Sequence, residues 1–294
     1  MHQAPAELPG RQWRKQLDSL GLAWPIEITV SRQTIRQASA SIHANQFGGV
    51  LPPGSVFAID EEKCVASPEL CLVQMANSLP LAKLIELGLE LCGSYSIPDR
   101  DLTESSLFSD NKTVYGLPPI TNVGRITSFI EQASGISGLR LARRALDYLQ
   151  NGSASPMETV LTLLLTLPYR LGGYGLPQPR LNARVKPSPI TRGYKEGKAY
   201  YALDLYWHEA RIAVEYDSDL HHTGADRINE DSMRRTDLAL MGINVITVTR
   251  QQVYGIADFD RVANLLASHL RTNLRHDRNP TFTDSRRKLR ESLL

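Results

Sequence analysis

Residues 199–217 read AYYALDLYWHEARIAVEYD, and this stretch decides the fold of the carboxyl half of the chain. Apolar side chains recur along both of its halves, and Val214 and Tyr216 share one face of the second half, a spacing typical of β-strands. The turn-like tetrapeptide WHEA separates the two halves. The pattern therefore predicts two strands, at 199–206 and 211–217, that form a hairpin.

The segments on either side of this hairpin alternate between helical and extended apolar spacing. The expected elements are a helix at 155–167, a strand at 180–186, a helix at 226–241, a strand at 243–248 and a last helix at 259–270. The apolar run at 243–248 is nearly continuous, which is typical of a buried central strand. Together these elements predict an α/β fold with an αβββαβ core.

The amino half predicts a smaller domain of α+β and helical character. Its expected strands lie at 26–30, 38–44 and 56–59, and its expected helices at 69–77, 81–91, 123–133 and 139–150. Asn151-Gly152 is a typical end for the last of these helices. We therefore expect a domain of unassigned role at 1–150 and a second domain at 151–272.

Composition and charge restrict the classes of protein to consider. Hydrophobic residues make up 42% of the chain and charged residues 22%, which is ordinary for a globular protein. The amino end resembles no signal peptide and no segment has the length of a membrane span, so we expect a cytoplasmic protein with no membrane partner.

Basic residues are concentrated near the carboxyl end, in a segment expected to be a basic tail at 273–294. With Arg271 just before it, the cations are Arg271, Arg275, Arg278, Arg286, Arg287, Lys288 and Arg290. Such a tail could neutralise phosphates, or it could simply be a solvated end of the chain.

The central hairpin gathers three carboxylates. Side chains two positions apart on a strand point to the same face, so Glu215 and Asp217 project together, and the turn brings Asp204 back beside them. Unneutralised carboxylates repel one another, and a hard divalent cation with oxygen ligands commonly offsets that repulsion. The sequence therefore predicts a Mg²⁺ or Mn²⁺ site here, with the backbone carbonyl of Tyr216 near the same edge.

At these residues the chain resembles a known superfamily. Leu203-Asp204 followed by Glu215-Tyr216-Asp217 resembles the PD-(D/E)XK nucleases, with Asp217 in place of their lysine. The histidine-containing run DSDLHH at 217–222 is similar to bacterial domains of unknown function related to very-short-patch-repair endonucleases. Further matches to those domains, which extend the resemblance over about 155–272, are Glu158, Asp231, Arg234, Arg235 and Gly242.

This resemblance implies a restriction-endonuclease-like core that hydrolyses DNA phosphodiester bonds, in repair or in defence against foreign DNA. Asp204 and Glu215 would be metal ligands, and the Tyr216 carbonyl would complete the coordination. A bound cation would lower the pKa of water. The residues implied to be catalytic are Glu158, Asp204, Glu215, Asp217 and His222, and those in a supporting role are His221, Asp231, Arg234 and Arg235.

Several of these residues have simpler interpretations. Because the superfamily lysine is absent, either His221 or His222 could act as the general base, and His222 is the one we expect in the site. Ser155-Pro156-Met157-Glu158 is also a capping box, so Glu158 could bind the helix amino terminus as well as the site. Asp231 and Arg235 are one helical turn apart and could form an exposed ion pair.

A regulator is the alternative function. The segment VASPE at 65–69 resembles the middle part of AbiEi-type antitoxins, some relatives of which carry a similar carboxyl-terminal domain. It suggests a catalytically inactive nuclease-fold protein that binds DNA, although the sequence shows no winged-helix amino terminus of the kind those antitoxins have. A module that has lost nucleic-acid binding is a third reading. DNA is the expected partner, while RNA and a homodimer remain open.

Overall fold

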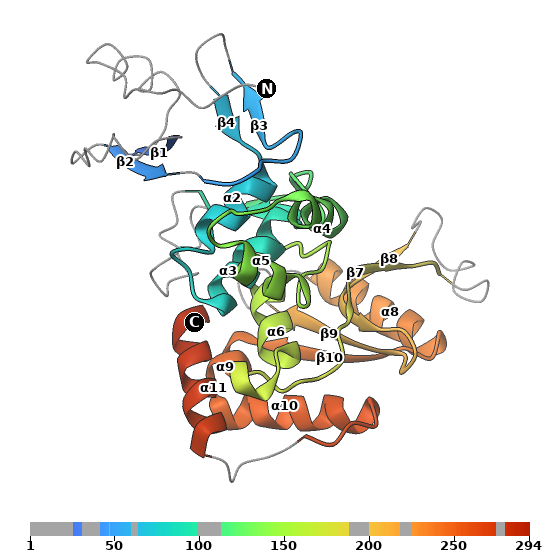
Figure 1. The fold of residues 1–294 in the computed structure, drawn as a ribbon. Helices are drawn as coiled ribbons and strands as arrows, with labels where there is room; N and C mark the ends of the chain where they lie inside the picture. The colour runs from blue at the N-terminus through green and yellow to red at the C-terminus, as the bar shows by residue number, and fades with distance from the viewer. Residues whose placement is uncertain are drawn as a thin grey trace. The chain divides into compact units, whose positions relative to one another are not determined.

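The fold of the chain is given by a computed structural model (Figure 1). It describes residues Ile26–Val30, Ile42–Gln46, 48–59, 64–98, 113–187, 200–217, 225–274 and 280–294. The protein is mixed α/β, as expected. Two compact units are distinguished, one of Met1–Ser78 with Arg125–Arg144, the other of Leu79–Gly124 with Ala145–Leu294. Each unit therefore combines two separate segments, a division that differs from the single break expected near Asn151.

Short strand pairs form part of the first unit. Strand β1 (Ile26–Val30) runs parallel to β2 (Ile42–Gln46), and β3 (Val56–Ala58) runs antiparallel to β4 (Cys64–Ala66). The strands expected at 26–30 and 56–59 are confirmed. The strand expected at 38–44 is observed as β2, while β4 was not expected.

In the first unit a side-chain cap starts helix α2 (Pro68–Met75), and a glycine turn packs closely against the same helix. Helix α2 begins after Ser67, whose Oγ accepts a hydrogen bond from the Leu70 N–H at 3.2 Å. Gly138 has φ +86°, and a Cβ there would lie 2.2 Å from the Val73 carbonyl oxygen, so only glycine allows this turn to pack on α2. The remaining helices, which lie mostly in this unit, are α4 (Val123–Gln132) and α5 (Leu139–Leu146).

The second unit has a helical core next to its sheet. Helix α3 (Leu81–Leu91) packs against α6 (Pro156–Thr166), and α6 is buried along nearly its whole length. Lys83 and Glu86 of α3 are both buried, and their ion pair at 3.0 Å offsets the cost of removing each charge from water. A short antiparallel pair, β5 (Tyr95–Ser96) with β6 (Val114–Tyr115), completes this part of the unit.

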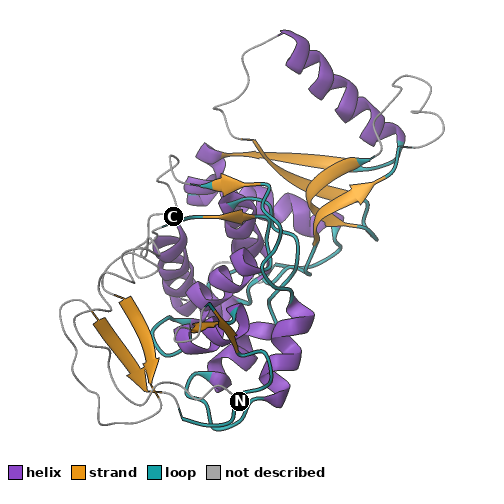
Figure 2. Cartoon of the chain, turned by 90° about the horizontal axis from the view of Figure 1, so that it is seen from above, coloured by secondary structure: helices purple, strands orange, loops and turns teal. Residues whose placement is uncertain are grey.

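The expected order of elements is present in the second unit. Strands β7 (Arg180–Val185), β8 (Tyr201–Trp207) and β9 (Ile212–Asp217) are antiparallel neighbours, and β10 (Asn244–Thr249) runs parallel to β9 after helix α8 (Ala225–Leu240). The four strands pair in the order β10-β9-β8-β7. Figure 2 shows all strands in orange and the helices in purple. Sheet and helix share one core, in which Leu203 and Ala213 pack with Leu238.

Strand β10 differs from its expected place. The apolar run at 243–248 predicted a central strand, whereas β10 is the outer member of the described sheet. Most of its residues are only partly buried, and Val248 is its fully buried member. Strand β9 already pairs with β8 on its other side, so β10 takes the remaining side.

The segment expected to be a basic tail contains a packed helix. After α9 (Arg250–Tyr254) and α10 (Ile256–His269), helix α11 (Pro280–Leu293) packs on the short helix η1 (Tyr169–Leu171). At Gly172, which follows η1, φ is +90° and a Cβ would lie 2.3 Å from the Ser285 carbonyl oxygen. Phe282, Leu289 and Leu293 of α11 are buried. Residues 280–293 are therefore part of the folded unit and not a free extension.

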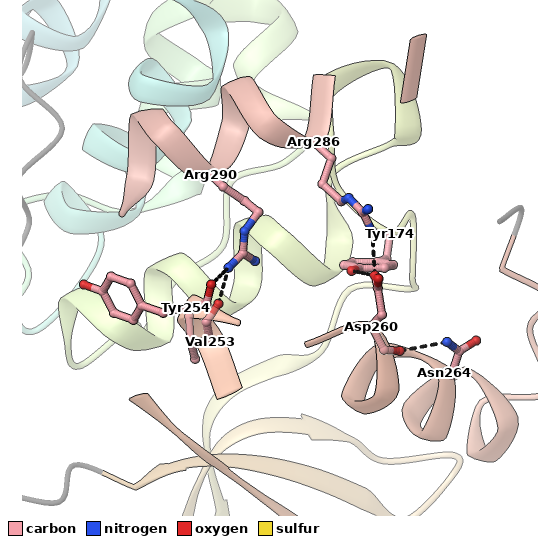
Figure 3. A network of polar contacts seen from close by, with 7 residues as sticks. All are labelled: Tyr174, Val253, Tyr254, Asp260, Asn264, Arg286 and Arg290. Atoms are coloured by element: carbon pink, nitrogen blue, oxygen red, sulfur yellow. Dashed lines mark hydrogen bonds and ion pairs between the residues drawn. The ribbon is translucent and has the colours of Figure 1, made fainter. Parts of the chain in front are cut away.

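Two arginine side chains of α11, Arg286 and Arg290, join this helix to the rest of its unit (Figure 3). Arg286 Nη1 lies 2.6 Å from Asp260 Oδ1, and the Tyr174 hydroxyl donates a hydrogen bond to the same carboxylate. Arg290 is buried and donates through Nη2 to the carbonyl oxygens of Val253 and Tyr254, the latter at 2.8 Å. Two of the cations expected to be available for phosphates thus have partners inside the protein.

None of the helices within the described ranges combines the length and the apolar character that crossing a bilayer requires.

Candidate functional site

Asp204 lies where strands β8 and β9 separate. Leu205 and Val214 form a ladder pair, and next to them the Tyr216 N–H donates to Asp204 Oδ2 at 2.9 Å. The side chain of Asp204 thus accepts a hydrogen bond from the neighbouring strand at the position beyond the last ladder pair. Because the carboxylate is bound to a backbone group, its place beside β9 is fixed.

Asn182 lies on the other side of Asp204, in strand β7. Its neighbours pair with β8 on either side of Asp204, Leu181 with Leu205 and Ala183 with Leu203. Asn182 itself has φ +45°, a left-handed conformation that asparagine tolerates better than most residues. Its Nδ2 donates to the Gly152 carbonyl at 2.9 Å and to Glu158 Oε2 at 2.5 Å. A break in the strand conformation therefore directs an amide toward a predicted site residue.

Asn182 was not singled out by the sequence. The available signal was weak: asparagine is depleted in strands, and here it interrupts a strand-like segment.

Glu158 takes part in the cap of α6, and its carboxylate also lies near Asp204. Ser155 caps α6, because its Oγ accepts from the Glu158 N–H at 3.2 Å. The Glu158 carboxylate in turn accepts from the Ala154 N–H at 2.8 Å, in addition to the Asn182 amide. The cap places this carboxylate in the first turn of α6, near Asp204.

Burial and mutual repulsion raise the pKa values of both carboxyl groups. Burial is the main cause that raises the pKa of Glu158 to about 7, and the charge of Asp204 adds to it. Burial likewise raises the pKa of Asp204 to about 6, against the opposing effect of the Tyr216 N–H; Glu215 raises the pKa further and Arg234 lowers it. Near neutral pH Glu158 is therefore partly protonated, and Asp204 keeps its proton to a higher pH than an exposed aspartate does, although it is mostly ionised at pH 7.

Glu215 is neutralised differently. Two nitrogens of Arg234 lie 2.5 Å from its two carboxylate oxygens, and Nη2 also donates to the Ala202 carbonyl at 2.6 Å. The side chains of Glu215 and Arg234 are 15% and 25% exposed, so this forked pair is mostly shielded from water. Helix α8, which carries Arg234, is held to β8 by a hydrogen bond from the Tyr201 hydroxyl to Asp237.

The other predicted site residues are less closely connected. Asp217 ends β9 opposite Thr249 of β10 and is half-buried. Arg235 is exposed on α8. Its neighbour Arg234, and not Arg235, contacts Glu215. His221 and His222 lie outside the described residues, as does the side chain of Asp231, and their roles stay predictions.

The expected convergence of Asp204, Glu215 and Asp217 around a cation is not found among the described residues, which include no group of three acidic, histidine or cysteine side chains arranged to hold a metal. Other features offset the repulsion that motivated this expectation: the raised pKa of Glu158 leaves that group partly protonated near pH 7, and the guanidinium of Arg234 pairs with Glu215. Asp204 and Glu215 nevertheless provide the hard oxygen donors that Mg²⁺ and Mn²⁺ prefer. Mg²⁺ is commonly held by one or two carboxylates and several waters, so these donors fit it.

The raised pKa of Glu158 gives a testable dependence of stability on pH. A carboxyl group whose pKa is higher in the folded chain than in the unfolded chain stabilises the fold while it is protonated. For Glu158 this contribution to the free energy of unfolding is complete below pH 4.5 and is lost as the pH rises through about 7. For Glu158 this loss is on the order of 3 kcal/mol. Urea unfolding of Glu158→Gln should therefore show a flatter fall in stability from pH 4.5 to 7.5 than the wild type.

The exposed Glu209 offers a matched control. Glu209→Gln makes the same chemical change on the surface of the same unit and should leave the wild-type pH dependence intact. Parallel curves for the wild type and Glu158→Gln would contradict the assignment of a proton to this carboxyl group.

Comparison of the chain with protein-family profiles, with characterised proteins and with solved structures gives no match. The residues and their geometry alone therefore carry the functional argument.

Proposed function

We propose that the second unit is a divalent-cation-dependent nuclease domain that hydrolyses DNA phosphodiester bonds. The observation that carries the proposal is a set of three neighbouring carboxyl groups on three different elements: Glu158 on α6, Asp204 on β8 and Glu215 on β9. They interact electrostatically, the first with the second and the second with the third. Shifted carboxyl pKa values of this kind are more common at functional sites than elsewhere.

The order of elements supports the same proposal. Acidic residues occupy α6, β8 and β9 of an α6-β7-β8-β9-α8-β10 series, which is the αβββαβ order of the superfamily that the sequence resembles. Asp204, Glu215 and the Tyr216 carbonyl would hold Mg²⁺ or Mn²⁺. When bound, such a cation lowers the pKa of water and neutralises charge on the phosphate.

Glu158 could supply part of the proton transfer for which the resembling superfamily has a lysine. A group that titrates near the working pH is well suited to accept and release protons, and the pKa of Glu158 is about 7. Asn182 and the Ala154 N–H hold its carboxylate in place. In this proposal Glu158 exchanges protons with water, Asp204 stays ionised as a ligand of the cation, and His222 keeps its predicted role as general base.

A cleavage assay tests the proposal directly. The purified full-length chain is incubated with supercoiled, linear, single-stranded and mismatched DNA and with RNA, in Mg²⁺, Mn²⁺ or a chelator. We expect DNA to be cut with either metal and left intact with the chelator. The double variant Asp204→Asn, Glu215→Gln, purified identically, reveals any contaminating nuclease. Intact DNA in every metal-containing reaction would contradict the proposal.

A second candidate, the catalytically inactive DNA-binding regulator, is favoured by the contact between Glu215 and Arg234. In that pair both carboxylate oxygens already have a cationic partner. A regulator would use the fold without the chemistry, and the guanidinium would then be a permanent structural replacement for a metal. Metal-independent DNA binding in a gel-shift assay, together with no cleavage, would favour this function over the nuclease.

A further inference from the structure

The forked contact between Arg234 and Glu215 points to a specific control of cation binding. We propose that Arg234 is a built-in competitor: its guanidinium holds Glu215 in the metal-free protein and must leave when a divalent cation binds. This inference rests on the proposed metal site, and it assigns to Arg234 a role beyond general support.

The geometry of the pair is the first argument. Each of the two Nη atoms of Arg234 contacts a different oxygen of Glu215, both at 2.5 Å. A guanidinium that binds a carboxylate through both oxygens occupies its most favourable acceptor directions. A cation that approaches Glu215 therefore meets an acceptor already in use and a positive charge next to it.

The second argument is that the guanidinium is held in this place. Arg234 Nη2 also donates to the Ala202 carbonyl of β8 at 2.6 Å. Helix α8 is fixed to the sheet by Leu238 in the shared core and by the Tyr201–Asp237 hydrogen bond. Several contacts thus hold Arg234 beside Glu215, and the Arg234–Glu215 pair is part of the folded structure.

The charges at the site give the third argument. Asp204 and Glu215 are the proposed ligands, and Arg234 neutralises the second of them. While the guanidinium remains, the pair of ligands carries little net negative charge, and the attraction for a divalent cation is weak. Release of the guanidinium restores the charge of Glu215 and also frees a planar donor group suited to a phosphate oxygen.

An opposite role is chemically reasonable, and the sign of one measurement separates the two. An arginine next to a metal ligand could instead orient it, and its loss would then weaken cation binding. A competitor has the reverse effect, because its removal leaves Glu215 free. We measure Mn²⁺ binding to the full-length chain by titration calorimetry, with electron paramagnetic resonance of the free ion as a second readout, so that cleavage activity is not needed.

The variants are chosen to isolate this one contact. Arg234→Gln should bind Mn²⁺ about tenfold or more tightly than the wild type, the size expected when a charge-assisted contact no longer competes. Arg261→Gln removes the same charge from an exposed position of α10 in the same unit and should stay within about twofold of the wild type. Arg234→Lys keeps the charge but cannot contact both oxygens of Glu215 at once, so its Mn²⁺ affinity should lie between those of the wild type and Arg234→Gln. If Arg234→Gln does not fold, Arg234→Lys takes its place in the comparison.

Each result has a definite meaning. Unchanged or weaker Mn²⁺ binding by Arg234→Gln, with binding by the wild type detected, overturns the competitor role and leaves the metal site standing. An equal gain in Arg261→Gln also overturns it, because the loss of any positive charge would then explain the effect. Absence of binding by the wild type and by every Arg234 variant overturns both this inference and the proposed metal site.

Discussion

Replacement of Glu215 by glutamine should reduce metal-dependent cleavage of DNA by about a thousandfold or more. The glutamine side chain has nearly the shape of glutamate and retains one oxygen for Arg234, but it lacks the charge that would hold a cation. Loss of a group that stabilises charge in a reaction typically costs ~10²–10³ in rate, and loss of the cation itself costs more. Initial rates of plasmid nicking, measured in saturating Mg²⁺ or Mn²⁺, give the comparison.

Two neighbouring carboxylates serve as controls. Glu209→Gln, at the exposed turn between β8 and β9, should cut DNA at the wild-type rate. Asp217→Asn should reduce the rate less than Glu215→Gln does, because Asp217 lies at the end of β9 and in the proposed site the cation is held mainly by Asp204 and Glu215. Wild-type activity in a clean preparation of Glu215→Gln would show that the active site is elsewhere.

Removal of the Arg290 side chain should lower the free energy of unfolding of the second unit by about 3 kcal/mol. Arg290→Ala deprives the Val253 and Tyr254 carbonyls of their donor and leaves a gap beneath α11. Buried polar groups without partners cost ~1–3 kcal/mol each, and the lost packing of the long side chain adds to this. Urea unfolding followed by circular dichroism measures the change.

Two further substitutions test the cause. Arg290→Met retains most of the packing without the donors and should be less destabilised than Arg290→Ala. Arg287→Ala, on the exposed side of α11, loses ion pairs with Asp284 and Glu291 and should scarcely move the unfolding midpoint. If Arg287→Ala and Arg290→Ala destabilise equally, the hydrogen bonds of Arg290 do not anchor the helix.

The elements of the second unit were largely predictable because their local patterns agree with their place in the fold. The helix at 81–91 is α3 to the residue, and the hairpin of β8 and β9 follows from alternating apolar residues with a polar turn. The position of a strand within the sheet was harder to predict, because an apolar run such as 243–248 indicates a strand without specifying which strands it pairs with. Helix α11 was missed because its many charges conceal the few buried residues, among them Phe282 and Leu289, that attach it.

The acidic residues of the candidate site could be predicted from the sequence, whereas the side chains that contact them could not. Asp204 and Glu215 were singled out by residue type and spacing, and Glu158 by the resemblance to a known superfamily; the structure describes Asp204 as interacting electrostatically with both of the others. Their partners were not predictable in detail. Asn182 adopts its left-handed conformation between two residues that pair with β8, which residue type does not indicate, and the contact of Arg234 with Glu215 depends on how α8 lies against the sheet.

The discontinuous build of the second unit has a practical consequence for dissecting the protein. Helix α6, which carries Glu158, packs against α3, a helix that precedes it by more than sixty positions along the chain. A fragment cut at residue 151 would retain every proposed catalytic side chain and yet expose the apolar surface of α6 that α3 covers. Such a piece would tend to aggregate, so biochemical work on the isolated unit should keep the segment that starts at Leu79.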